Sequence, residues 1–131
     1  MKNYLGIDWG EKRIGLAIAD NENNIATPFK TIENISKLLE IIKEEEINEL
    51  VIGLPKKMSG DKTDNVKFMK FVEILKEKLI EKKIKINFID ERLSSVQADT
   101  LTVKGIKQQG RDSLSAMIIL QVFLDRNYDK N

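Results

Sequence analysis

The stretch YLGIDWGEKRIGLAIA, residues 4–19, decides the fold of this 131-residue chain. Two apolar runs, Tyr4–Trp9 and Arg13–Ala19, flank the short polar segment Gly10–Lys12. Apolar runs of this length around a tight turn predict a pair of antiparallel strands. Asp8 lies near the end of the first predicted strand, where a carboxylate would be held on a rigid element.

Further elements follow outward from this pair. The strand predicted at Ile25–Ile32 contains Pro28, which favours an edge position because proline cannot donate to the ladder. The apolar period then changes from that of a strand to that of a helix at Ile35, and Asn34 is suited to cap this helix. The remaining predictions are a buried strand at 50–53, a helix from 63 or 64 to 79, a strand at 84–88, a short helix at 95–103 and an apolar helix from Asp112 to about Arg126.

The order of these elements is β-β-β-α-β-α-β-α-α, which predicts an α/β fold. The expected sheet is five-stranded and mixed, with an antiparallel meander of strands 1–3, two further parallel strands, and helices on both faces. A chain of this length is expected to form a single domain over residues 1–131.

The composition excludes several classes of site. The chain has no histidine and no cysteine, which removes the common zinc sites, cysteine nucleophiles, Ser-His-Asp triads and disulfides. The first apolar run meets Asp8 almost at once, so no signal peptide is expected, and the apolar runs are too short to span a bilayer. We therefore expect a cytoplasmic protein without a membrane partner.

Three acidic residues stand where the fold could bring them together. Asp8 and Glu91 lie at the carboxyl ends of two predicted strands, which would meet at one edge of the sheet if the strands are parallel, and Asp112 opens the final helix. Carboxylates without another catalytic residue type favour hard divalent cations, Mg²⁺ or Mn²⁺, acting on a phosphate. The three acids therefore predict a nuclease, a hydrolase of ester bonds that uses two metal ions.

Each acid also has a simpler interpretation, which for Glu91 is a salt bridge to the neighbouring Arg92. Asp8 could cap a turn, and Asp112 could be an ordinary first-turn acid of its helix, which is compatible with metal binding. Asp90 and Glu91 are adjacent, and strand alternation sends them to opposite faces, so one of the two is expected to reach the site. The residue pattern alone does not choose between them.

Basic residues around these acids are candidates for binding nucleic acid. Seven are predicted as phosphate contacts: Lys12, Arg13, Arg92, Lys56, Lys57, Lys107 and Arg111. Arg13 is equally suited to pair with a carboxylate inside the fold. Residues 40–49 carry five glutamates, and a polyanion would avoid that segment, although a plain solvated surface explains the charge equally well.

Four blocks of the sequence resemble a known family. They are GIDWGEKRIG at 6–15, VIGLP at 51–55, DERLSS at 90–95 and DSLSA at 112–116, with Leu120 and Gln121 following. The chain is similar to the YqgF or RuvX family, the pre-16S rRNA nucleases with an RNase H-like fold. The blocks occur in the order of the family and cover the whole chain.

The resemblance implies a nuclease that processes the 5′ end of pre-16S rRNA, with Asp8, Glu91 and Asp112 as catalytic, metal-binding acids. It selects Glu91 over Asp90. It also implies association with ribosomal particles, as a monomer or weak homodimer. The family has a longer, more basic stretch before the final helix, whereas residues 105–111 here contain only Lys107 and Arg111 as basic residues.

Three other functions fit parts of the pattern. A Holliday junction resolvase would use the same site on four-way DNA and would require a dimer. An ATP-binding domain related to sugar kinases and actin shares the Asp8-Trp9-Gly10 pattern but needs a second such domain. A non-catalytic RNA- or ribosome-associated module would keep the fold with a vestigial site.

Overall fold

The computed structural model describes residues 1–55, 62–90 and 108–130. Their elements are β1 (Asn3–Trp9), β2 (Ile14–Asp20), β3 (Thr27–Ile32), α1 (Ile35–Glu44), β4 (Glu49–Leu54), α2 (Lys62–Leu79), the short 3-10 helix η1 (Ile80–Lys82), β5 (Lys85–Asp90) and α4 (Gln108–Lys130). The short helix predicted at 95–103 lies outside the described residues. Every other predicted element is present.

The five strands form one mixed sheet in the order β3-β2-β1-β4-β5. β1 pairs antiparallel with β2, and β2 pairs antiparallel with β3. β4 runs parallel to both β1 and β5. The prediction of an antiparallel meander with two added parallel strands is confirmed, and the carboxyl ends of β1, β4 and β5 meet at one edge of the sheet.

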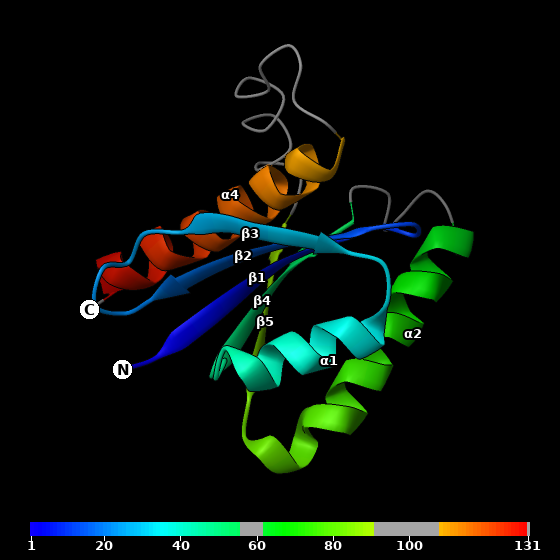
Figure 1. Cartoon of the computed structure of the whole chain (residues 1–131), viewed down its shortest axis with the longest axis horizontal. Coiled ribbons are helices and arrows are strands. Elements are labelled where there is room, and N and C mark those ends of the chain that lie inside the picture. Colours follow the sequence, from blue (N-terminus) through cyan, green and yellow to red (C-terminus); the bar gives the residue numbers. More distant parts are fainter. Residues whose placement is uncertain (56–61, 91–107, 131) are drawn as a thin grey trace.

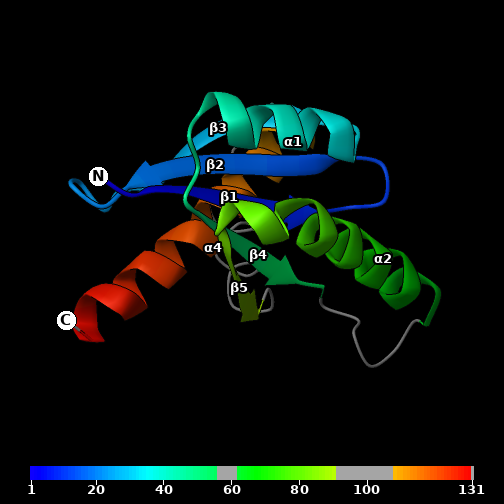
Figure 2. The ribbon, with the colours of Figure 1, turned by 90° about the horizontal axis from the view of Figure 1, so that it is seen from below.

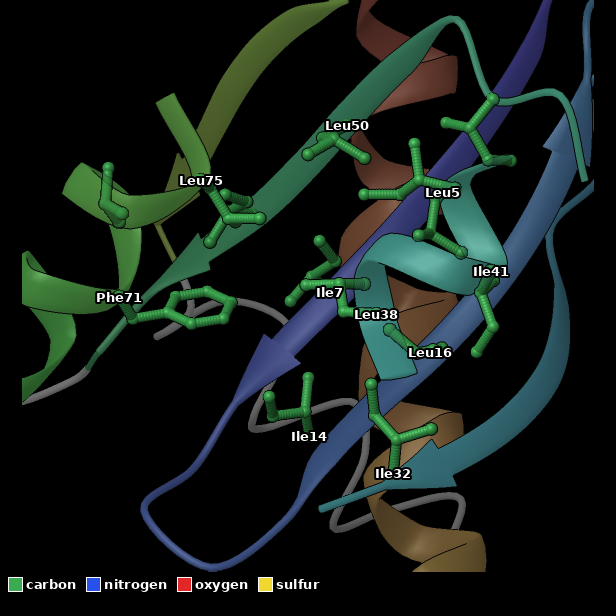
Figure 3. Close-up of a cluster of buried hydrophobic side chains, with 14 of the residues drawn as sticks. Leu5, Ile7, Ile14, Leu16, Ile32, Leu38, Ile41, Leu50, Phe71 and Leu75 are labelled. Atoms are coloured by element: carbon green, nitrogen blue, oxygen red, sulfur yellow. The ribbon is translucent and has the colours of Figure 1, made fainter. Parts of the chain in front are cut away.

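Helices cover both faces of this sheet, with α1 and α2 on one side and α4 on the other (Figures 1 and 2). The first face is packed with large aliphatic side chains, among them Leu5, Leu16 and Leu50, against Leu38 of α1 and Leu75 of α2 (Figure 3). The second face contributes smaller residues to a separate cluster around α4. Strand alternation explains the division, because successive side chains of β1 and β2 point to opposite faces.

Two local predictions are resolved by hydrogen bonds. The Asn34 side chain accepts from the Lys37 amide at 2.9 Å, so the predicted helix cap is confirmed. β3 is an edge strand, as Pro28 indicated, but it begins at Thr27 and not at Ile25. The reason is that the Ala26 amide donates to a side chain of α4 at 2.8 Å and so leaves the ladder.

The final helix begins earlier than predicted, at Gln108 instead of Asp112, and it continues to Lys130. Asp112 therefore lies beyond the first turn, and its interpretation as an ordinary first-turn acid is wrong. Gly110 disfavours a helix through this position, because glycine inside a helix costs about 1 kcal/mol relative to alanine. Packing of α4 on the sheet outweighs such a cost, and the Ser113 hydroxyl donates to the Gly110 carbonyl at 3.1 Å within the helix.

A solvated acidic surface is one interpretation of residues 40–49, but Glu49 is not part of such a surface. It begins β4 and is buried, where it pairs with Lys2 at 2.9 Å and accepts from the Asn87 amide at 2.9 Å. Burial raises the pKa of Glu49, but the bonds from Lys2 and Asn87 and the charges of Lys2 and Lys85 outweigh it, so the pKa is lowered overall. In the part of the chain that the structure describes, no helix is both long and apolar enough to cross a membrane.

Candidate active site

Asp8 lies near the carboxyl end of β1, on the face of the sheet that α4 covers. Its neighbour Ile7 is buried in the cluster under α1 and α2, so alternation turns Asp8 the other way. Gly6 shows the same orientation, because a Cβ added there would lie 2.8 Å from the Ala116 carbonyl oxygen of α4. Asp8 is half-buried at this position.

Asp112 is brought to the same place by a close approach of α4 to β2. Gly15 of β2 stands directly opposite Asp8 in the β1–β2 register. A Cβ built on Gly15 would lie 2.1 Å from the Asp112 carbonyl oxygen, which no real side chain could occupy. Gly15 therefore lets the backbone of α4 rest on the strand beside Asp8, and two of the three predicted acids share one end of one face.

Arg13 completes this corner of the site. Its Nε donates to Oδ2 of Asp112 at 2.9 Å, across 99 residues of sequence. The Asp112 side chain retains 18% of its exposure and the Arg13 side chain 37%, so the pair is partly shielded from water. The intramolecular pairing considered for Arg13 is thus present, and its partner is one of the predicted catalytic acids.

The hairpin that carries Asp8 is anchored to α2 on the opposite face. The Trp9 ring packs edge-on against Phe68, with centroids 5.7 Å apart, and lies 6.1 Å from the Phe71 ring. In the turn, Glu11 forms an ion pair with Lys67. These contacts fix the end of β1 and therefore the backbone position of Asp8.

Several predicted site residues cannot be placed. Glu91, Arg92, Lys56, Lys57 and Lys107 lie outside the described residues. Asp90, the alternative to Glu91, ends β5. Its neighbour Ile89 belongs to the cluster around α4, so Asp90 points to the opposite face from Asp8 and Asp112.

The two remaining basic candidates lie close to the site in sequence. Lys12 is exposed in the β1–β2 turn, next to Arg13, and Arg111 is exposed on α4, next to Asp112. Both positions border the corner formed by Asp8 and Asp112. Cations beside clustered acids suit a polyanionic substrate, because they compensate the negative charge that the acids present to it.

Gln121 is a structural residue whose role the sequence pattern did not predict. Its Oε1 accepts from the Ala26 amide at 2.8 Å, and its Nε2 donates to the Asn24 carbonyl at 3.2 Å. The side chain thus joins the β2–β3 connection to α4. The signal for this role is a single amide within the otherwise apolar stretch 116–124 of this helix.

Asp8 and Asp112 suit a hard divalent cation in kind, since both offer carboxylate oxygens from rigid elements on one face. Their number is insufficient: among the side chains that the structure describes, no three acids gather closely enough to hold a metal ion. A third ligand would have to come from outside these residues.

Comparisons of the sequence with known proteins identify its relatives. A family model described as RuvX, Holliday junction resolvase, matches residues 2–126. A relative in Sulfurihydrogenibium sp. (strain YO3AOP1), named as a pre-16S rRNA nuclease, is 43% identical over 96% of this chain and 92% of its own length. One of the same name in Endomicrobium trichonymphae is 36% identical over 99% of this chain and 100% of its own.

Solved structures support the same fold. RuvC of T. thermophilus in complex with a Holliday junction substrate matches with a TM-score of 0.66 and 12% identity, over 97% of this chain and 96% of that one. The Fowlpox virus resolvase complexed with Holliday junction DNA matches with a TM-score of 0.52 and 14% identity, over 98% and 97%. At these identities the likeness concerns the fold alone, and it confirms the RNase H-like class. Because the family model covers nearly the whole sequence and the relatives match over almost their full length, the chain belongs to the RuvX family.

Proposed function

We propose that this chain is a metal-dependent nuclease that hydrolyses phosphodiester bonds and processes the 5′ end of pre-16S rRNA. The observation that carries the proposal is the convergence of Asp8 and Asp112 on one face, on either side of Gly15. The names of the curated relatives support the choice of RNA substrate. The whole of residues 1–131 would act as one nuclease domain, in the cytoplasm and in contact with ribosomal particles.

Glu91 is the proposed third acid of the site. The orientation of Asp90 supports this assignment, because Asp90 points away from the face that carries Asp8 and Asp112. Asp8, Glu91 and Asp112 would together hold two ions of Mg²⁺ or Mn²⁺. When bound, such ions supply Lewis-acid chemistry, stabilising the charge that develops on the phosphate and making water a stronger nucleophile.

The chain's own residues would bind and orient the substrate. Lys12 and Arg111 are exposed beside the acids and are proposed to contact the phosphate backbone. Arg92, Lys56, Lys57 and Lys107 are proposed to extend this surface. The anchoring of Trp9 against α2 would keep Asp8 in place while substrate binds.

The test is cleavage of a labelled 5′ pre-16S rRNA fragment in Mg²⁺ or Mn²⁺ by wild type, Asp8→Asn and Asp112→Asn. Both variants keep the shape of the side chain and remove its charge. Asp125→Asn is the matched control, because Asp125 is an exposed acid on the same helix as Asp112. We expect cleavage by wild type and the control, and loss of at least 100-fold in the two site variants, in line with the cost of removing a single catalytic group.

Chelation of the metal should abolish cleavage by wild type. Retention of activity by Asp8→Asn would contradict the metal-site assignment. Absence of RNA cleavage by wild type, with these fragments and both metals, would contradict the proposed activity itself.

A second candidate function is resolution of four-way DNA junctions, which is favoured by the description of the matching family model. The same experiment includes a synthetic junction as a parallel substrate. Symmetric cleavage of the junction without cleavage of the rRNA fragment would select this function. It would also require a dimer in solution, because two sites must act on two strands.

A further inference from the structure

We propose that Arg13 is a positioning residue that holds Asp112 in its metal-binding orientation and does not contact substrate phosphate. This inference rests on the proposed function, because it assigns Arg13 a role toward a carboxylate that the proposed function places at the metal. It also revises the prediction that Arg13 binds nucleic acid.

The geometry of β2 places Arg13 where it can do this. Gly15 and Ala17 of β2 lie on the strand face under α4, since Gly15 contacts Asp112 and Ala17 belongs to the cluster around α4, and Arg13 immediately precedes this strand and bonds to Asp112. The side chain therefore points toward the helix that carries Asp112. The Nε–H group of the guanidinium donates a hydrogen bond to Oδ2 of Asp112, with 2.9 Å between the nitrogen and the oxygen.

The bond links two elements that must be held in register. Arg13 immediately precedes Ile14, which pairs with Trp9 in the same hairpin that carries Asp8. A bond from Arg13 to Asp112 thus ties the second acid to the element that carries the first. Partners of ligating carboxylates in other metal sites orient their ligands in this way, and their loss typically costs 10–100-fold in metal affinity or activity.

The positive charge of Arg13 also favours its position beside Asp112. Asp8 and Asp112 lie at one end of one face, and two carboxylates brought together repel each other. The positive guanidinium of Arg13, bonded to Oδ2, offsets this repulsion at Asp112. The partial shielding of the pair from water strengthens the interaction relative to an exposed ion pair.

The experiment compares wild type with Arg13→Gln, which keeps an N–H donor without the charge, and Arg13→Lys, which keeps the charge without the Nε geometry. The matched control is Lys37→Gln, which removes a cation from the exposed Lys37–Glu40 pair on α1. Calorimetry with Mn²⁺ alone measures metal affinity, a gel-shift titration in chelator measures affinity for the pre-16S fragment, and a thermal melt confirms that each variant is folded.

For Arg13→Gln we expect a Kd for Mn²⁺ about tenfold higher than in wild type, a cleavage rate about 10–100-fold lower, and an RNA Kd within about twofold of wild type. Arg13→Lys should recover part of the metal affinity, and Lys37→Gln should match wild type. A merely structural pair would lower the melting temperature without changing metal affinity in the folded protein.

A rise in the RNA Kd with unchanged Mn²⁺ affinity would overturn the inference and return Arg13 to the phosphate contacts. Unchanged values for both would overturn it as well. Failure of the proposed function is distinguishable, because wild type itself would then bind no Mn²⁺ and cleave no RNA, whatever residue occupies position 13.

Discussion

The two faces of the sheet are built from different residues for different purposes. The face under α1 and α2 is filled by large aliphatic and aromatic side chains such as Leu38, Leu75 and Phe68, each at most 1% exposed. The face under α4 includes the small residues Gly6, Gly15 and Ala17 beside a few larger ones, such as Tyr4 and Ile89. Large side chains bury apolar area, whereas small ones let a helix backbone rest on the strands.

This difference separates stability from the placement of the acids. Burial of large side chains is the main favourable term in folding, so the first face should dominate the free energy of unfolding. The second face buries less but sets how far Asp112 lies from Asp8, because the close approach at Gly15 leaves no room for a Cβ. Substitutions on the first face should therefore mainly lower the free energy of unfolding. Substitutions on the second face should mainly lower the rate of cleavage.

The largest loss of stability is expected from Leu38→Ala, which empties a fully buried position on the α1 face. Deleting a buried leucine side chain costs about 2–5 kcal/mol, depending on how well the cavity collapses. Urea denaturation measures the loss, and Leu39→Ala, at a half-buried neighbour, should lose less. Below the melting temperature, cleavage of pre-16S RNA should stay within a few-fold of wild type; a 100-fold loss would show that the two faces are not separable.

Gly15→Ala should lower the rate of cleavage more than it lowers stability. The added Cβ would lie 2.1 Å from the Asp112 carbonyl oxygen, so α4 must move by more than 1 Å. Overpacking of this kind costs about 1–3 kcal/mol, and a displacement of about 1 Å at a catalytic group can cost about 100-fold in rate. Urea denaturation and cleavage kinetics on the same preparation check both numbers.

Gly6→Ala is the comparison for this prediction, because its Cβ would meet the Ala116 carbonyl oxygen and the Leu120 side chain, each at 2.8 Å, further along α4. The added Cβ at Gly6 overlaps its neighbours less than the one at Gly15, and Ala116 lies about one helical turn from Asp112. We therefore expect a similar loss of stability and a smaller loss of cleavage rate. Equal rates for Gly15→Ala and wild type would refute the placement of Asp112 as a requirement for catalysis.

The smallest effect on stability is expected at Glu49, which begins β4 at the end of the sheet opposite to Asp8. Its pKa is below the ordinary 4.5 in the folded protein, so the unfolded chain binds more protons as the pH falls. The stabilisation by Glu49 is therefore complete above pH 4.5 and is lost as the pH falls through the folded pKa. Wild type should be more stable than Glu49→Gln at pH 7, and urea denaturation between pH 7 and pH 3 should show the difference shrinking below pH 4.5; a constant difference would contradict the linkage.

Local patterns predicted much of this architecture. The two apolar runs in residues 4–19 and the change of period at Ile35 were sufficient to predict β1, β2 and α1, because apolar runs of strand length and a helical apolar period mark the segments that pack into a core. Asn34 was identified as a cap and Pro28 as an edge residue from their backbone chemistry, and both predictions are confirmed. The start of α4 was wrong, since packing on the sheet extends the helix through Gly110 against its propensity.

The sequence by itself determined the order of the described elements, the absence of histidine and cysteine chemistry, and the position of Asp8 near a strand end. Only the tertiary structure decided that Asp112 lies across Gly15 from Asp8, that Arg13 pairs with Asp112, and that Gln121 joins α4 to the β2–β3 connection. These contacts join residues about a hundred positions apart. They depend on how closely a helix can approach a strand, a distance that side-chain volumes set in three dimensions and that periodicity along the chain does not contain.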